Sequence, residues 1–254
     1  MPRDKWTREQ TIVVLNLYCK IPFNRVSSKH PDIIHIAKTI GRTPNSVKMK
    51  IGNFGSFDTE LKKRGIVGLG NTSKLDKLVW NEFNRDWDNL AYESELLISK
   101  FTNQPLENLP EINIADIPVG KEREAIIRAR INQNFFRSTV LSSYNLKCCV
   151  TGLSIPDFLV ASHIIPWAKD EKNRLNPHNG LCLNSIHDKA FDKGFITVSV
   201  DYKIKVSKYF NDFRKEKAVA DLFLKYENRP IILPDKFLPS KEFLEYHYKN
   251  IFRK

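Results

Sequence analysis

The chain has 254 residues, 41% of them hydrophobic, with 10 Gly and 13 Pro, which is typical of a globular protein rather than a disordered or fibrous one. Its apolar runs are too short to span a membrane and we see no secretory signal, so we expect an intracellular protein. The net charge of +12 favours a polyanionic partner such as nucleic acid, although a membrane surface or solubility alone would also account for it.

The charge is unevenly distributed along the chain. Residues 1–77 carry 15 Lys or Arg against 6 Asp or Glu, residues 78–120 carry 2 against 8, and residues 121–254 carry 24 against 15. Residues 101–120 contain three prolines and no Lys or Arg, which favours an extended linker over a continuous helix. We therefore predict a helical domain at 1–100, a proline-rich linker at 101–120 and a second domain at 121–254.

The first domain begins with signals for three helices. Thr7 is a plausible N-cap for a first helix, because Glu9 and Gln10 follow it and apolar residues then recur at helical spacing. Residues 30–54 are typical of a helix, a tight turn and a second helix. In this segment Gly41 ends one helix, and Thr43 caps the next.

This pattern predicts a helix-turn-helix unit, in which the second helix faces the major groove of DNA. Val47 and Ile51 should pack inward. Asn and Lys side chains suit base edges and phosphates, and the face expected to be exposed offers Asn45, Ser46, Lys48, Met49 and Lys50. The alternative is a small three-helix bundle whose basic face is only solvated. Farther along, an aromatic stripe at helical spacing favours core packing over base stacking.

The second domain begins with an amphipathic helix and continues as strand, long polar loop, strand and helix. The strands are predicted at FLVASHI and GLCLN, and the helix at SIHDKAF, with Ser185 as a possible cap. This order places His163 at the end of the first strand, Asn179 at the exit of the loop and His187 in the first turn of the helix.

Residues 145–207 resemble the HNH endonuclease family, whose nuclease module is a ββα-metal finger. The similarity is carried by CVTG, SHIIPW, RLNPHNGLCL, HDKAFDKGFI and VSVDYKIKVS. The earlier segments WTREQ, NLYCKIPF, GRTPNSVKMKIGNF and LAYESE are similar to the flanking region of a subgroup of predicted bacterial restriction endonucleases. The resemblance implies an α+β fold and a metal-dependent DNA endonuclease in the bacterial cytoplasm, namely a restriction enzyme.

The resemblance also implies roles for three residues. His163 would be the general base, His187 a ligand of Mg²⁺ or Mn²⁺, and Asn179 the residue that orients the loop and His163. These roles suit phosphodiester hydrolysis, which needs a base to activate water and a cation to stabilise the charge that develops on the leaving oxygen. Neutral imidazole near pH 7 serves both histidine roles.

The sequence departs from the family at the position before the first catalytic histidine. Many HNH proteins have an acidic or histidine metal ligand there, whereas this chain has Ser162, a poor ligand for a hard cation. The second ligand is left open between Asp188, Asp192, and a shell completed by water and the scissile phosphate.

Several residues near these positions have alternative interpretations. His163 would be structural if it only bonded to the backbone, and His178 is expected to be a loop residue. Arg174 and Lys172 would hold a phosphate or would only be solvated. The three cysteines of this domain are expected to be buried thiols, with a zinc brace as the less favoured alternative; they are Cys148, Cys149 and Cys182.

One such site cuts one strand, so a homodimer is the economical arrangement for cutting double-stranded DNA. A cognate DNA methyltransferase would accompany a restriction enzyme. Two alternatives remain open at this stage: a structure-selective or nonspecific HNH nickase, and a DNA-binding protein with an inactive HNH module.

Overall fold

The computed structural model describes residues 5–63, 65, 72–108 and 121–254. It divides into two compact units, Met1–Thr139 and Val140–Lys254. The division falls inside α7 (Lys121–Ser143), whereas the sequence prediction placed it at 101–120, of which 109–120 lie outside the described residues.

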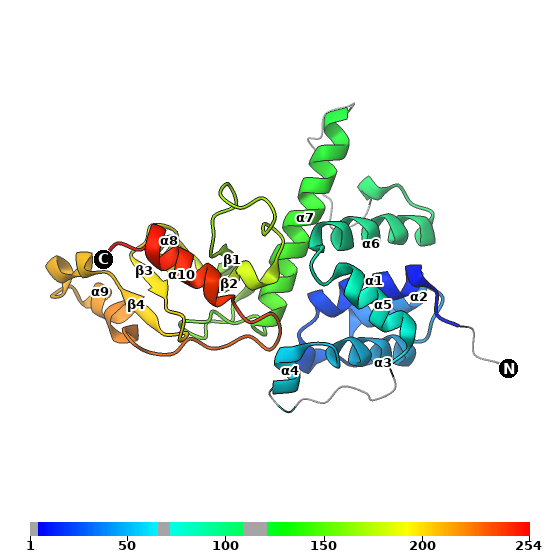
Figure 1. Ribbon diagram of the computed structural model, residues 1–254, viewed down its shortest axis with the longest axis horizontal. Helices are drawn as coiled ribbons and strands as arrows, with labels where there is room; N and C mark the ends of the chain where they lie inside the picture. Colours follow the sequence, from blue (N-terminus) through cyan, green and yellow to red (C-terminus); the bar gives the residue numbers. More distant parts are fainter. Residues whose placement is uncertain (1–4, 64, 66–71, 109–120) are drawn as a thin grey trace. The chain divides into compact units, whose positions relative to one another are not determined.

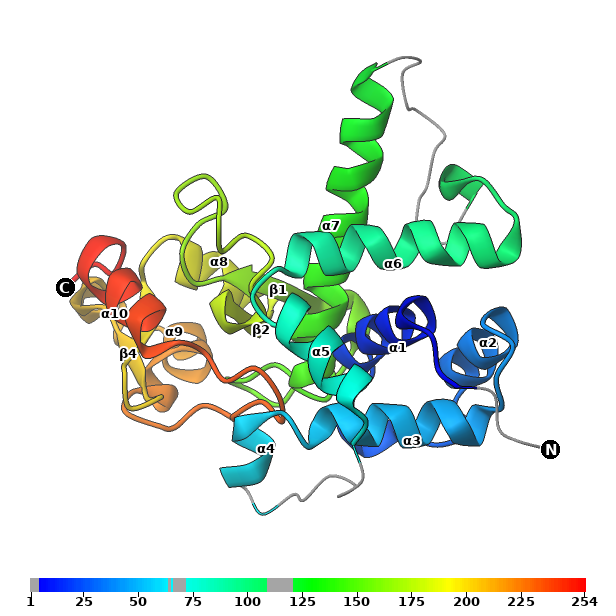
Figure 2. The same cartoon turned by 45° about the vertical axis from the view of Figure 1, so that its right-hand side comes forward.

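The first unit is helical in the part that the structure describes (Figures 1 and 2). Its helices are α1 (Arg8–Lys20), α2 (Pro31–Thr39), α3 (Pro44–Gly55), α4 (Thr59–Lys63), α5 (Lys74–Phe83), α6 (Trp87–Thr102) and most of α7, with 3-10 turns η1 (Phe23–Arg25) and η2 (Leu106–Asn108). Helix α1 is buried along most of its length because it packs against α3, α5 and α6, while α2 packs against α3.

Local capping determines where these helices begin, as the sequence predicted. The Thr7 hydroxyl accepts a hydrogen bond from the Gln10 amide, and the Gln10 side chain accepts one from the Thr7 amide, which forms a capping box. Thr43 caps α3 by accepting from the Ser46 amide. Gly41 has a φ of 68°, a conformation that glycine adopts at little cost after a helix.

The part of α7 up to Thr139 belongs to the first unit, because it packs against α6. The rings of Trp87 and Phe135 stack with centroids 6.4 Å apart, and Arg128 forms an ion pair with Asp88 at 2.5 Å. An amphipathic helix needs a partner for its apolar face. The partner of this part of α7 is α6, which precedes residues 101–120 for most of its length.

The second unit contains the predicted strand, loop, strand and helix. Its elements are η3 (Pro156–Phe158), β1 (Leu159–His163), η4 (Pro177–Asn179), β2 (Gly180–Asn184), α8 (Ser185–Asp192), β3 (Ile196–Val198), β4 (Ile204–Val206), η5 (Lys208–Phe213), α9 (Lys217–Leu222), η6 (Leu224–Tyr226) and α10 (Lys241–Asn250). Strands β1 and β2 are antiparallel, with His163 opposite Gly180, and α8 packs on both. The α+β class is confirmed.

The prediction of Ser185 as the cap of α8 is wrong. Asn184 is the N-cap, and its side-chain oxygen accepts from the amides of Ile186 and His187. Ser185 is the first residue of the helix, and its hydroxyl donates to the Phe158 carbonyl. Asparagine is a strong N-cap residue, and here it also ends a strand, so both elements meet at one residue.

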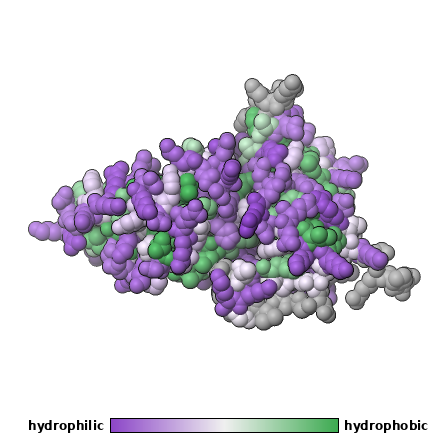
Figure 3. Space-filling view, in the orientation of Figure 1, coloured by the Kyte–Doolittle hydropathy of each residue, from purple (hydrophilic) through white to green (hydrophobic). Residues whose placement is uncertain are grey.

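Apolar side chains fill the interior of each unit, and hydrophilic side chains cover most of the face shown in Figure 3. Phe243 and Leu244 of α10 are buried. All four cysteines are buried free thiols. No helix in the described ranges is long and apolar enough to cross a membrane.

Candidate functional site

His163 stands at the end of β1, half-buried beside the polar loop. Its Nε2 lies 2.9 Å from the Arg174 carbonyl oxygen, and its ring meets that of Trp167 edge-on at 5.5 Å. A carbonyl accepts only, so Nε2 carries the proton of the neutral ring and Nδ1 carries the lone pair. Burial lowers the pKa of His163, against the opposing effects of the Arg174 carbonyl and Asp188, so the neutral form prevails near pH 7.

Asn179 fixes the loop that contacts His163. Its side-chain oxygen accepts from the Ile165 amide at 2.8 Å, and its amide nitrogen donates to the carbonyls of Ile165 at 3.1 Å and Asn173 at 3.2 Å. Asn173 precedes Arg174, whose carbonyl faces the His163 ring. The buried Asn179 therefore holds both ends of the segment that orients His163.

His187 is 1% exposed in the first turn of α8, and both of its ring nitrogens face oxygen atoms. Nδ1 lies 2.9 Å from Oδ1 of Asn184, and Nε2 lies 2.9 Å from the Leu222 carbonyl oxygen. The rings of Phe223 and Tyr226 pack against it. As placed, His187 joins the first turn of α8 to the end of α9, and a metal ion would have to replace one of these contacts.

Ser162 precedes His163 on β1, and the charge of Asp188 on α8 acts on the His163 ring. The Ser162 hydroxyl is buried, 2% exposed as a residue, with no hydrogen-bond partner of normal geometry, yet it lies near enough to Asp188 to lower that carboxyl's pKa. Burial has the larger effect and raises the pKa of Asp188. Asp192, one turn later on α8, is exposed as a residue, but partial burial of its carboxyl, followed by the charge of Asp188, raises its pKa. Asp188 is thus the carboxyl whose charge acts on the His163 ring.

The side chain of Arg174 contacts residues of its own loop. Its Nε donates to the Trp167 carbonyl at 2.9 Å, its guanidinium lies 5.2 Å from the centre of the Trp167 ring, and Nη1 pairs with Glu171 at 3.2 Å. Its side chain remains 30% exposed. Lys172 on the same loop is exposed, whereas His178 lies in the 3-10 turn η4 and its ring bonds to the Leu238 carbonyl.

The second helix of the predicted DNA-binding pair is α3. Val47 and Ile51 are fully buried, as predicted, while Asn45, Lys48 and Met49 are exposed. Ser46 is half-buried, and its hydroxyl donates to the Thr43 carbonyl at 2.9 Å, so it belongs to the cap of the helix.

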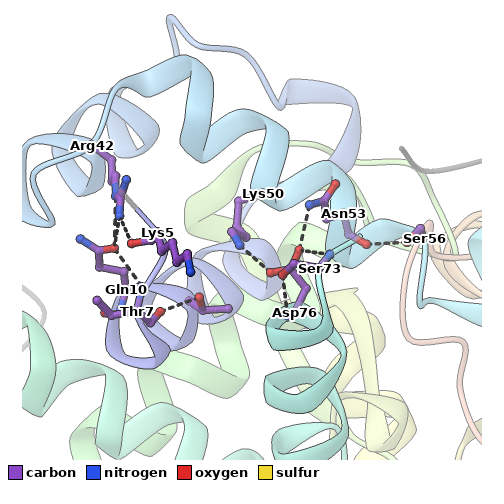
Figure 4. Close-up of polar contacts among 10 residues, drawn as sticks. Lys5, Thr7, Gln10, Arg42, Lys50, Asn53, Ser56, Ser73 and Asp76 are labelled. Carbon is purple, nitrogen blue, oxygen red and sulfur yellow. Dashed lines mark hydrogen bonds and ion pairs between the residues drawn. The ribbon is translucent and has the colours of Figure 1, made fainter. Parts of the chain in front are cut away.

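The prediction that Lys50 lies on the exposed face is wrong. Lys50 is 4% exposed, its Nζ lies 2.5 Å from Oδ1 of Asp76, and the ring of Trp6 lies 4.4 Å from the same nitrogen. Asn53 donates to the other oxygen of Asp76 at 2.8 Å (Figure 4). A buried ammonium needs a charged partner, and Asp76 in the first turn of α5 is that partner for Lys50.

Two features of these sites were not predicted from the sequence. Asp76 was not singled out, although its place three residues after Ser73 is the signal of a capping box, which the structure forms. The contact of Leu222 with His187 had no local signal, because it joins residues 35 positions apart.

Two antiparallel strands and a helix, with a histidine at the end of the first strand, define a ββα unit. Residues 148–199 match the model of the HNH endonuclease family, described as HNH endonuclease. The match covers this unit and includes His163, Asn179 and His187. A comparison of the chain with curated proteins finds none that matches.

The HNH family implies a divalent metal ion, and the unit offers it few ligands. No group of three or more His, Cys, Asp or Glu side chains among the described residues is arranged to hold a metal. Mg²⁺ is commonly held by one or two carboxylates, with water and substrate phosphate completing its shell. Asp188 fits this requirement, because it is a carboxyl in the first turn of α8 and its charge acts on His163.

Proposed function

We propose that the protein is a metal-dependent DNA endonuclease of the HNH type, which hydrolyses phosphodiester bonds. The observation that carries the proposal is the orientation of His163 at the end of β1, where the Arg174 carbonyl leaves Nδ1 as the basic nitrogen. The match of this segment to the HNH endonuclease model supports the same conclusion.

In this proposal His163 accepts the proton of the attacking water at Nδ1. Asn179 keeps the ring in position by fixing the loop around Arg174. Asp188 would hold Mg²⁺ or Mn²⁺, and His187 would join it only after giving up its hydrogen bond to Leu222. The bound ion would stabilise the negative charge that develops on the leaving oxygen.

The first unit would bring the DNA to this site. Helices α2 and α3 follow each other across the turn at Gly41, and the exposed face of α3 offers Asn45 and Lys48. We propose a helix-turn-helix contact through these two residues, with Lys48 binding a phosphate and Asn45 a base edge. Arg174 is a further candidate for phosphate contact through the exposed part of its side chain.

A restriction role in the bacterial cytoplasm, a homodimer that cuts both strands, and a cognate methyltransferase all belong to this proposal. They derive from the resemblance of the flanking segments to predicted bacterial restriction endonucleases, and from the need for two cuts per duplex.

The test is incubation of the purified protein with unmodified and modified plasmid DNA in Mg²⁺, Mn²⁺ or EDTA. His163→Ala is the inactive variant, and His35→Ala, at an exposed position of α2, is the matched control. Metal-dependent discrete fragments, lost only in His163→Ala, would support the restriction enzyme. Open circles would favour a nickase, and DNA binding without cleavage on any substrate would indicate an inactive HNH module.

A further inference from the structure

A basic segment follows the ββα unit. Residues 202–229 contain eight Lys or Arg against four Asp or Glu. Seven of these cations are exposed: Lys203, Lys208, Arg214, Lys215, Lys217, Lys225 and Arg229. Within the described part of the chain, Lys208, Lys215 and Lys217 have no ion pair, so their charges are available to an anionic partner.

A row of aromatic rings reaches the surface among these cations. The ring of Tyr209 lies 5.1 Å from that of Phe195 and 5.6 Å from that of Phe213, the latter pair tilted by 32°. Tyr209 is 51% exposed and Phe213 is 36% exposed. Large aromatic side chains gain by burial, so two neighbouring rings left at the surface form a face available for a ligand.

The row is anchored from within the unit. Phe210 stacks on Phe223 with centroids 4.8 Å apart, and Phe223 packs against His187 of the candidate site at 5.6 Å. At the other end, the guanidinium of Arg253 lies 4.5 Å from the centre of the Phe195 ring. The exposed rings are therefore held by packed neighbours and are continuous with helix α8.

Exposed rings beside unpaired cations have the chemistry that binds single-stranded nucleic acid. Bases stack on aromatic faces, phosphates pair with Lys and Arg, and neither contact requires a particular sequence. A duplex presents base edges rather than base faces, so it would leave Tyr209 and Phe213 without partners. The acidic side chains of the segment, such as Asp212 and Glu216, are outnumbered by its cations.

We propose that this basic–aromatic surface, formed by Lys208, Tyr209, Phe213, Arg214 and Lys215, binds an unpaired DNA strand. Bases stack on Tyr209 and Phe213, and the neighbouring phosphates contact Lys208, Arg214 and Lys215. The choice of DNA rests on the proposed function, and the contact gives that function a substrate that contains an unpaired strand.

The experiment measures binding of fluorescent oligo(dT) and of a duplex of equal length by anisotropy, in EDTA so that no cleavage occurs. The variants are Tyr209→Ala, Phe213→Ala and Tyr209→Phe. Tyr248→Ala is the matched control, because Tyr248 is 39% exposed and also lies beside a cation, on the separate helix α10. Each alanine variant at the surface should weaken oligo(dT) binding about tenfold, since one stacked base contributes that much or more.

Tyr209→Phe keeps the ring and should bind oligo(dT) like the unchanged protein, as should Tyr248→Ala. Thermal denaturation of each variant shows whether it folds, and a Lys208→Ala/Lys215→Ala variant tests the same surface without touching the aromatic packing. The proposal is overturned if the unchanged protein does not bind oligo(dT), or if folded surface variants bind it as before. Because binding is measured without metal, this failure is separate from a failure to cleave plasmid DNA.

Discussion

Lys50 and Asp76 form an ion pair inside the first unit, with Nζ 2.5 Å from Oδ1, and they join α3 to the first turn of α5. Burial alone would raise the pKa of Asp76, but the hydrogen bonds from Lys50 and Asn53 outweigh it, and the pKa is lowered. The same carboxylate accepts from the Ser73 amide, so one side chain completes a helix cap and neutralises a buried cation.

Removing one partner of this pair should cost more stability than removing both. Asp76→Ala leaves the Lys50 ammonium buried without its partner, and breaking a buried pair costs about 3–5 kcal/mol. The double variant Lys50→Met/Asp76→Leu replaces both charges by apolar groups and should recover much of that loss. Urea denaturation measures the free energy of unfolding, and equal losses in the single and double variants would refute the account.

His163→Ala should abolish cleavage while leaving DNA affinity nearly unchanged. The loss of a general base lowers the rate by about 10²- to 10⁴-fold. The rate of plasmid cleavage and the anisotropy of a labelled duplex measure the two quantities. Should affinity collapse together with activity, and the His35→Ala control keep both, His163 would have a structural role instead.

Asp188→Asn should weaken Mn²⁺ binding, measured by calorimetry without substrate, by about tenfold or more. His187→Gln should mainly lower stability, by about 1–3 kcal/mol, because the Leu222 carbonyl and Asn184 lose a buried partner. The reverse result, with Mn²⁺ affinity lost in His187→Gln and kept in Asp188→Asn, would place the ion on His187.

Lys48→Ala should reduce the salt dependence of duplex binding. Each phosphate contact contributes about one unit to the slope of log affinity against log salt, so one unit should be lost. Lys29→Ala, at an exposed position of the same unit before α2, serves as the control. An unchanged slope in Lys48→Ala would remove α3 from the DNA interface.

Folding stability should fall in acid because of His247. Its ring is buried, stacks on Phe191 at 3.7 Å and bonds to Thr197 Oγ1 at 2.8 Å, and burial lowers its pKa from 6.5 to about 4. A depressed histidine pKa means that the unfolded chain takes up the proton first, so stability is complete above pH 6.5 and is lost as pH falls towards 4. The loss should approach about 3 kcal/mol.

Urea denaturation at pH 7 and at pH 4.5 measures this effect. His247→Gln should remove most of the pH dependence that His247 causes, while His35→Gln, at an exposed position, should keep it. The same pH dependence in His247→Gln and in the unchanged protein would show that other groups cause the loss.

Local signals in the sequence were sufficient for much of the fold. The caps at Thr7 and Thr43 bond to amides three residues away, so their residue types define them. The order strand, loop, strand and helix also followed from short patterns, and the strand end at His163 is where it was predicted. The division within α7 was not predicted, because it depends on which helix covers the apolar face of α7.

By itself, the sequence predicted a histidine at a strand end, His163, an asparagine at a loop exit, Asn179, and a helix at α3 that exposes Lys48. Only the tertiary structure decided that Lys50 turns inward to Asp76, that His187 bonds to Leu222, and that the charge of Asp188 acts on His163. The physical reason is distance along the chain. Burial and hydrogen bonding depend on partners far away in sequence, whereas capping and periodicity are complete within a few residues.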